Sequence, residues 1–248
     1  MTLARTFKFA LAGAASLALV ACGTETDEGG IAEGDPIAAI PAPEGTEWRD
    51  MVTVTDADGY LVGNPDAPIK LIEYGSLTCG ACANFSMTGV EPLKEKYVSS
   101  GVVSFELRNQ IHNGIDLVMA RMVRCSSPEA FHPLADQVWA NLGAILQQAQ
   151  QNPAALEAAM QLPENERFVR IAENTGLLDF FAARGLSADQ ARTCLADAES
   201  VQAIAERSDT QSAELGVTGT PTFFINGNKV DANNWNALEP LLQRAGAR

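Results

Sequence analysis

Two cysteines, Cys79 and Cys82, are separated by only two small residues, and they carry the clearest chemistry in the sequence. At this spacing two thiols can cycle between a dithiol and a disulfide. An apolar run at 69–75 precedes the pair and a helical pattern at 83–97 follows it. Because a helix N-terminus favours negative charge, we expect Cys79 to be the nucleophilic thiolate and Cys82 the resolving thiol.

The segments around this pair predict a βαβ unit. Residues 69–75 are apolar enough for a central strand, and residues 102–107 predict the second strand. Pro92 falls within the intervening helix and is expected to kink or break it. Upstream, residues 51–55 alternate in polarity and residues 60–62 are apolar, so both predict short strands.

Helical periodicity dominates from about 112 to 215. Three cap signals support helix starts in this block, namely Ser127-Pro128, Asn152-Pro153 and the box beginning at Ser187. Residues 222–225 then predict a strand, followed by an Asn-Gly turn, a return strand at 228–230 and an amphipathic helix. The order βαβ, helical block, ββα predicts an α/β thioredoxin-like fold, with a central mixed sheet and a helical insertion.

The N-terminal segment has the pattern of an export signal. Arg5 and Lys8 precede an apolar run at 9–20, which is short for a transmembrane span. The run ends in Leu-Val-Ala-Cys, which resembles a bacterial lipobox and implies cleavage after residue 21 and lipidation of Cys22. The alternative is an ordinary secretory signal with an incidental cysteine. Either interpretation predicts export to a compartment that permits disulfides.

The remaining chain divides into a linker and one domain. Residues 22–47 are small, polar and proline-rich, so we expect a flexible tether after the lipidated cysteine. Residues 48–248 are long enough for a single domain with a substantial core. The formal net charge is −14, and loss of residues 1–21 would lower it to about −16. Such acidity argues against nucleic-acid binding.

Three segments resemble the DsbA family of periplasmic thiol–disulfide oxidoreductases, together covering about 60–230. They are the stretch from Glu73 to Cys82, the Pro-containing helix segment 91–97, and the segment 215–227 with its Gly-Thr-Pro-Thr-Phe-Phe-Ile-Asn-Gly run. The resemblance implies a cis Pro221 packed beside the redox pair, and a Thr220 whose backbone groups meet an incoming substrate strand. It also implies that Glu73 relays protons to the buried thiol, whereas the alternative is a strand-end Glu facing solvent.

Two further cysteines, Cys125 and Cys194, both fall in the helical block. Two leftover thiols in an oxidising compartment usually pair, and some DsbA relatives have a second disulfide in this domain. We therefore expect a structural disulfide, worth on the order of 4 kcal/mol. The alternative is two buried free thiols that pack as small apolar residues.

The other chemistry-bearing residues have simpler interpretations. His112 and His132 are expected to be surface or capping residues, and the three tryptophans, Trp48, Trp139 and Trp235, to be packing residues. Cys79 and Cys82 could instead form a structural bridge or half of a zinc site, completed by His112, His132, Cys125 or Cys194. No second Cys-x-x-Cys accompanies them. We therefore expect neither a metal nor a cofactor.

The resemblance implies an exported enzyme that donates its disulfide to folding proteins with free thiols, and a membrane redox partner that reoxidises it. Two departures bear on the direction of electron flow. Gly80-Ala81 replaces the Pro-His of the best-known family oxidant, and Thr220 replaces its Val. The alternatives are a reductase or isomerase of the same fold, and a non-catalytic lipoprotein that binds peptides beside Pro221.

Overall fold

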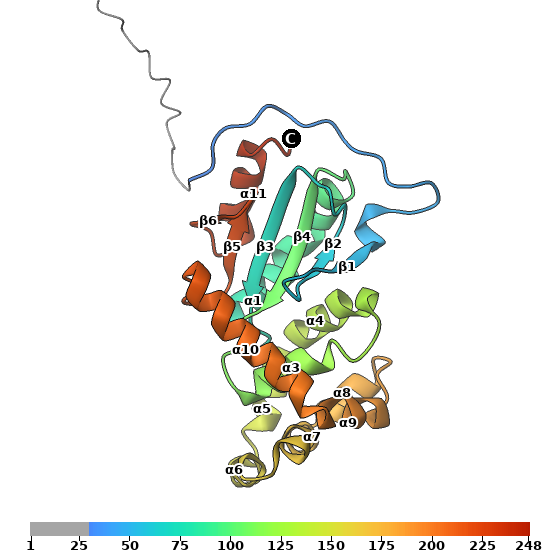
Figure 1. Cartoon of the computed structure of the whole chain (residues 1–248), viewed down its shortest axis with the longest axis vertical. Helices are drawn as coiled ribbons and strands as arrows, with labels where there is room; N and C mark the ends of the chain where they lie inside the picture. The colour runs from blue at the N-terminus through green and yellow to red at the C-terminus, as the bar shows by residue number, and fades with distance from the viewer. Residues whose placement is uncertain (1–29) are drawn as a thin grey trace, which may run out of the picture.

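The computed structural model describes residues 30–248, which fold around a six-stranded sheet of order β1-β2-β4-β3-β5-β6 (Figure 1). Strands β3 and β4 run parallel at the centre, and the other neighbouring pairs are antiparallel. This is the mixed α/β thioredoxin-like sheet expected from the sequence. The strands are β1 (Val52–Val54), β2 (Tyr60–Val62), β3 (Ile69–Gly75), β4 (Val103–Asn109), β5 (Thr222–Ile225) and β6 (Asn228–Val230).

The two central strands end side by side. In their parallel register Gly75 of β3 lies opposite Asn109 of β4. The loops that follow, at 76–79 and 110–113, therefore start from the same edge of the sheet. This edge is the usual location of functional residues in α/β proteins.

One helical run connects β3 to β4. It begins with α1 (Gly80–Phe85), passes through a π-helical turn at Ser86–Val90 and α2 (Glu91–Leu93), and ends in a second π-helical turn at Lys94–Val98. Of the kink or break predicted at Pro92, the break does not occur, because the backbone stays right-handed helical through this point. The wider π-helical turn relieves the clash that a proline ring makes with the preceding turn of a regular helix.

The helical insertion lies against the carboxyl ends of β3 and β4 (Figure 1). The Asn152 and Ser187 caps form as predicted, Ser187 in a complete capping box. Ser127 makes no cap hydrogen bond and precedes only a 3-10 turn, Pro128–Ala130. The helices are α3 (Gly114–Met122), α4 (Phe131–Ala140), α5 (Leu142–Ala149), α6 (Pro153–Met160), α7 (Glu164–Asn174), α8 (Leu177–Ala182), α9 (Ala188–Ala196) and α10 (Ala198–Leu215).

A disulfide joins the segment just after α3 to α9 of the insertion. Cys125, just beyond the end of α3, is bonded to Cys194 of α9, and their Cα atoms are 6.0 Å apart. The bond closes a loop across 69 positions. It holds the C-terminal end of α3 in place, which matters because the other end of α3 reaches the Cys79 loop.

The last segment completes the core. Hairpin β5–β6 leads to α11 (Trp235–Arg244). Phe223 and Phe224 are both buried on opposite faces of β5, one in the main core and the other beside Tyr74 and Val217. The predicted packing role of the tryptophans is confirmed, because Trp48, Trp139 and Trp235 are all buried.

The part of the expected tether that the structure describes, residues 30–47, lies against the domain rather than apart from it (Figure 1). Ile31 is buried, and Ile37 packs against the core. The backbone N–H groups of Gly34 and Ile37 donate to carbonyls at the C-terminal end of the chain. A few isoleucines and a line of backbone hydrogen bonds are thus enough to fix a segment whose composition indicates disorder.

The predicted signal segment 1–21 and the predicted lipidation site Cys22 lie outside the described residues. Between residues 30 and 248, no helix is both long and apolar enough to cross a membrane. A 3-10 turn at Trp48–Asp50 begins the domain proper.

Candidate active site

Cys79 and Cys82 occupy the first turn of α1. Cys79 is the N-cap residue, and its Sγ accepts a hydrogen bond from the backbone N–H of Cys82 at 3.3 Å. Cys79 is partly exposed, whereas Cys82 is fully buried. Both are free thiols in this structure. The first cysteine is therefore the one that another protein can reach.

Thr220 lies directly beside Cys79. The two residues are brought together by the loop before β5, in which the Thr220–Pro221 peptide bond is cis, as the family resemblance implies. When protonated, the Cys79 thiol donates to the carbonyl oxygen of Thr220 at 3.3 Å. The cis-Pro221 loop therefore lies directly beside the Cys79 sulfur.

The surroundings of Cys79 favour its thiolate. A hydrogen bond from the Cys82 side chain is the largest cause that lowers the pKa of Cys79, to about 5, against the opposing effect of burial. The Thr220 side chain and the backbone N–H groups of Cys82 and Ala81 also stabilise the anion. The pKa of Cys82 is raised, first by its hydrogen bond to Cys79 and then by burial. The pair thus consists of a nucleophilic thiolate and a protonated resolving thiol.

Glu73 is a buried carboxyl group close to this pair. It sits on β3 with no exposed surface, and neither of its oxygens has a hydrogen-bond partner among the described residues. Burial raises its pKa well above the usual value, and the charges of Asp136 and Cys79 act in the same direction. The solvent-facing alternative for Glu73 is therefore wrong. Its negative charge in turn helps to raise the pKa of Cys82.

Asp116 of α3 anchors the loop that leads into Cys79. Its buried carboxylate accepts hydrogen bonds from Ser76 Oγ at 2.7 Å, Leu77 N at 2.8 Å and His112 N at 2.9 Å. Trp139 also donates to the Ser76 carbonyl at 3.0 Å. Sequence reasoning missed Asp116. The Asn-Gly-Ile-Asp pattern at 113–116 could have indicated a helix start, but not the contact with a loop 40 positions away.

The two histidines have different surroundings. His112 is exposed, as expected, but its Nε2 lies 3.4 Å from Thr220 Oγ1 and so beside the candidate site. His132 is not a surface residue, because it is buried and its Nε2 is 2.9 Å from the Tyr60 carbonyl oxygen. Burial lowers the pKa of His132 to about 3, so the ring is neutral. The expectation failed for His132 because its neighbours come from a distant strand.

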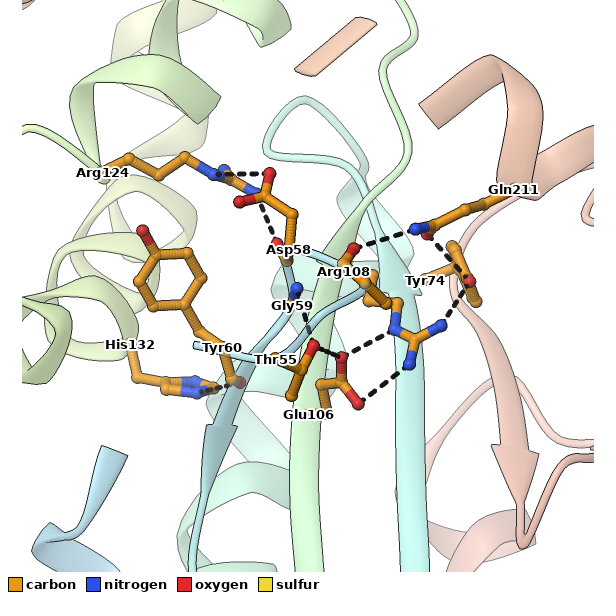
Figure 2. A network of polar contacts seen from close by, with 11 residues as sticks. Thr55, Asp58, Gly59, Tyr60, Tyr74, Glu106, Arg108, Arg124, His132 and Gln211 are labelled. Atoms are coloured by element: carbon orange, nitrogen blue, oxygen red, sulfur yellow. Dashed lines mark hydrogen bonds and ion pairs between the residues drawn. The ribbon is translucent and has the colours of Figure 1, made fainter. Parts of the chain in front are cut away.

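A polar network fixes the central strands to the insertion (Figure 2). Arg108 of β4 forms a two-pronged ion pair with Glu106 and donates to the Tyr74 hydroxyl at 3.0 Å. That hydroxyl donates to Gln211 of α10, while Thr55 donates to Glu106 at 2.6 Å. These contacts hold β3 and β4, the strands that lead into the two loops of the site, to α10 and to the turn after β1.

The zinc alternative loses two of its candidate ligands, because Cys125 and Cys194 are joined in the disulfide. Across residues 30–248, no group of three or more His, Cys, Asp or Glu side chains is arranged to hold a metal ion. Cys79 and Cys82 instead have the partners that support thiol–disulfide exchange, namely a stabilised thiolate, a buried thiol and a nearby carboxyl group.

Comparison with known sequences agrees with this chemistry. Residues 55–244 match a family described as Thioredoxin. A Rickettsia bellii protein provisionally named a protein-disulfide oxidoreductase is 23% identical over 194 residues, which make up 77% of this chain and 65% of that relative. The chain thus spans slightly less than two thirds of the relative's length.

Solved structures give the same fold. The protein-disulfide isomerase of Novosphingobium aromaticivorans is 27% identical, with a TM-score of 0.69 over 74% of this chain and 94% of that one. Wolbachia pipientis alpha-DsbA1 is 21% identical, with a TM-score of 0.60 over 81% and 96% of the two chains. The chain belongs to the thioredoxin family, has a DsbA-like fold and carries a Cys-x-x-Cys pair at the start of α1.

Proposed function

We propose that this protein is an exported enzyme that oxidises the thiols of folding proteins with a Cys79–Cys82 disulfide. A substrate thiolate attacks Cys79 Sγ, the disulfide breaks, and Cys82 leaves and takes up a proton. A second substrate thiolate then attacks the substrate sulfur of the mixed disulfide. Cys79 leaves as a thiolate, so the substrate is oxidised by two electrons and the enzyme becomes a dithiol.

The observation that carries this proposal is the low pKa of Cys79, about 5. A thiol of low pKa is a good leaving group, so release of oxidised substrate from Cys79 is favoured. The same stabilised thiolate favours the reduced form of the enzyme over its disulfide, which makes the disulfide a stronger oxidant. The hydrogen bonds from Cys82, Thr220 and the helix N-terminus take the place of a histidine between the cysteines.

Glu73 is proposed to handle the proton of Cys82. Cys82 leaves into a buried site where its thiolate is disfavoured, so it needs a proton at that moment. The raised pKa of Glu73 favours its protonated form, which can supply that proton. In the reverse direction the same group accepts the proton from the Cys82 thiol.

The proposed location is outside the cytoplasm, on a membrane. The Cys125–Cys194 disulfide suits an oxidising compartment, and the N-terminal pattern supports export with a lipid on Cys22. Radiolabelled palmitate fed to cells that express the chain tests the anchor. Wild type should take up label and Cys22→Ala should not, whereas equal labelling would refute lipidation at this residue.

A reductase or isomerase is the second candidate. It is favoured by the likeness to the Novosphingobium protein-disulfide isomerase and by Thr220 next to the redox pair. Equilibration of Cys79–Cys82 with glutathione separates the two directions. We expect a potential nearer to that of DsbA, about −120 mV, than to that of thioredoxin, about −270 mV. A thioredoxin-like value would overturn the oxidase proposal.

Refolding of reduced ribonuclease tests whether the protein is a catalyst at all. Oxidised wild-type protein should accelerate disulfide formation, and Cys79→Ser should not. Equal rates would favour a non-catalytic peptide-binding lipoprotein.

In the cell, a membrane redox protein is the proposed electron acceptor. The reduced enzyme should therefore accumulate in membrane-free preparations, and adding membranes should reoxidise it.

A further inference from the structure

An apolar pocket of about 310 Å³ opens at the start of α3, between this helix and helices α6 and α7. Its walls include Ile115, Leu156, Met160 and Ile171. Met160 keeps 48% of its surface exposed, which is unusual for a large apolar side chain in this protein. The pocket therefore presents apolar surface that the described part of the chain leaves uncovered.

The glycine at position 114 leaves space beside two of the residues that line the pocket. A Cβ atom at Gly114 would lie 3.9 Å from Met160 Sδ and 4.0 Å from Ile171 Cδ1, which are ordinary contact distances. A side chain there would fit without a clash and would occupy the space next to both residues. A helix start does not require glycine at this position, and an alanine would favour the helix.

The pocket adjoins the redox site. Asn113, which lines it, donates through its side-chain amide to Thr78 Oγ1 at 3.2 Å, one residue before Cys79. On the other side of Asn113, His112 lies beside Thr220. A polypeptide bound at Cys79 that extended past Asn113 would therefore reach the pocket.

We propose that this pocket is a subsite for one apolar side chain of the protein substrate, a few residues from the cysteine that attacks Cys79. The inference rests on the proposed function, since it supplies the substrate chain. Unfolded proteins carry aliphatic and aromatic side chains that a native protein would bury. A flexible methionine at the rim suits such an occupant, because its thioether adapts to side chains of different shape.

Paired cysteine peptides test the subsite. Each pair differs only by Leu or Ser at one position, which is scanned on both sides of the cysteine, and the rate of mixed-disulfide formation with oxidised enzyme is measured. At one offset we expect Leu to be about tenfold faster, since half-burying an aliphatic side chain is worth roughly 1.4 kcal/mol. Equal rates at every offset would overturn the proposal.

Two variants that fill the pocket sharpen the test. Gly114→Ala and Gly114→Val should progressively abolish the Leu preference while leaving the Cys79 pKa unchanged. The matched control is Gly143→Val, the same change in the first turn of α5, where a Cβ meets no atom within 4 Å. Met160→Glu should also abolish the preference, with Val54→Glu as the control at an exposed apolar residue of β1. If the Leu preference survives both Gly114→Val and Met160→Glu, the side chain binds elsewhere and the proposed subsite is wrong.

A binding measurement separates this inference from the proposed chemistry. Peptides with Ser in place of Cys are titrated into Cys79→Ser protein, and the methyl signal of Met160 is followed by NMR. Suppose that the wild-type enzyme oxidises none of the cysteine peptides, but that the peptide with Leu at the scanned position still shifts Met160 more than its partner with Ser there. The proposed function would then be wrong and the subsite would stand. If wild type sediments as a dimer and Gly114→Val as a monomer, a second copy covers the pocket and the subsite is refuted.

Discussion

The carbonyl oxygen of Thr220 lies 3.3 Å from Cys79 Sγ, although 141 positions separate the two residues. The intervening chain comprises the helical run after the redox pair, then β4, then the helical insertion. The insertion leaves the sheet at the loop after β4 and returns at the cis-Pro221 loop, so it frames the redox pair on both sides. His112 lies in the first of these connections and Asp116 just after it, at the start of α3, whereas Thr220 lies in the second.

The thiolate of Cys79 should persist well below neutral pH. With a pKa of about 5, the thiolate fraction at pH 4 is about tenfold smaller than at pH 7. Alkylation of the reduced protein by iodoacetamide, corrected for the reagent, should therefore have a midpoint near pH 5. A midpoint near the ordinary value of 9.0 would contradict the stabilising contacts around Cys79.

Replacement of Cys82 tests the largest of those contacts. In Cys82→Ala the hydrogen bond to the Cys79 thiolate is lost, so the pKa of Cys79 should rise. Cys82→Ser keeps a donor at this position and should raise the pKa less. The thiolate ultraviolet absorbance of the three proteins against pH gives the order directly. Identical curves would assign the low pKa to the backbone and Thr220 alone.

The same pKa predicts how stability depends on the redox state. Because the Cys79 pKa is lowered on folding, from 9.0 to about 5, its contribution is complete above about pH 9 and disappears as pH falls through 5. The oxidised protein has no such thiolate. The reduced form should therefore gain stability over the oxidised form as pH rises from 5 to 8, measured by guanidinium unfolding with and without reductant.

Much of the framework could be predicted from local patterns. The strand over 69–75, the hairpin at 222–230 and the Ser187 capping box all depend on residues close together in the sequence, and all form. Pro92 predicts a kink or break because a proline disrupts a regular helix. The break does not form because the helix has π-helical turns on both sides, and no composition signal marks these.

The parts of the site that sequence could not predict are contacts across long separations. Asp116 reaches Ser76 over 40 positions and His112 reaches Thr220 over 108. No sequence motif marks either contact, because each depends on how the insertion packs against the sheet. The order of residues 30–47 was missed for the same reason. Its few isoleucines become stabilising only when the C-terminal end of the chain lies beside them.

Glu73 should lower the stability of the protein while serving its chemistry. Its pKa is raised above 4.5 on folding, so the contribution of Glu73 to stability is most favourable below pH 4.5 and is lost as pH rises towards the folded pKa. Glu73→Leu should therefore raise the free energy of unfolding by about 1–3 kcal/mol at pH 7, since an unpaired polar group is removed. The gain should be smaller at pH 4, where the unfolded carboxyl is largely protonated as well and only the cost of burying the neutral group remains, and guanidinium titrations at the two pH values measure the difference.

Glu73→Gln separates proton transfer from shape. Glutamine keeps the size of the side chain but supplies no proton to the leaving Cys82. The rate of substrate oxidation should fall by about a hundredfold, the lower end of what a positioned acid contributes. The Cys79 pKa should move little by comparison. Unchanged single-turnover rates across pH 5–8 would exclude the proposed role of Glu73.

The Cys125–Cys194 disulfide should matter for stability rather than for electron transfer. The double change Cys125→Ser and Cys194→Ser opens a loop of 69 positions and should cost about 4 kcal/mol. That corresponds to a Tm lowered by roughly 10 °C for a domain of this size. The paired change Cys79→Ser and Cys82→Ser is the control and should have a much smaller effect. Equal losses would show that both bonds act alike.

Asp116 should couple the insertion to the redox site. Asp116→Ala leaves Ser76 Oγ, Leu77 N and His112 N without their acceptor, and we expect a loss of about 3 kcal/mol. Asp209→Ala, at an exposed position of α10, should change stability by less than about 0.5 kcal/mol.

The pKa of Cys79 shows whether Asp116 positions the thiolate or only stabilises the fold. The loop that Asp116 holds places Cys79 at the N-terminus of α1, so a loosened loop weakens the hydrogen bonds from Cys82 N and Thr220 to its sulfur. Asp116→Ala should therefore raise the Cys79 pKa and slow its alkylation at pH 6, whereas Asp116→Asn, which keeps an acceptor, should restore part of both. If stability falls but the Cys79 pKa stays at about 5, Asp116 supports the fold without setting the thiolate.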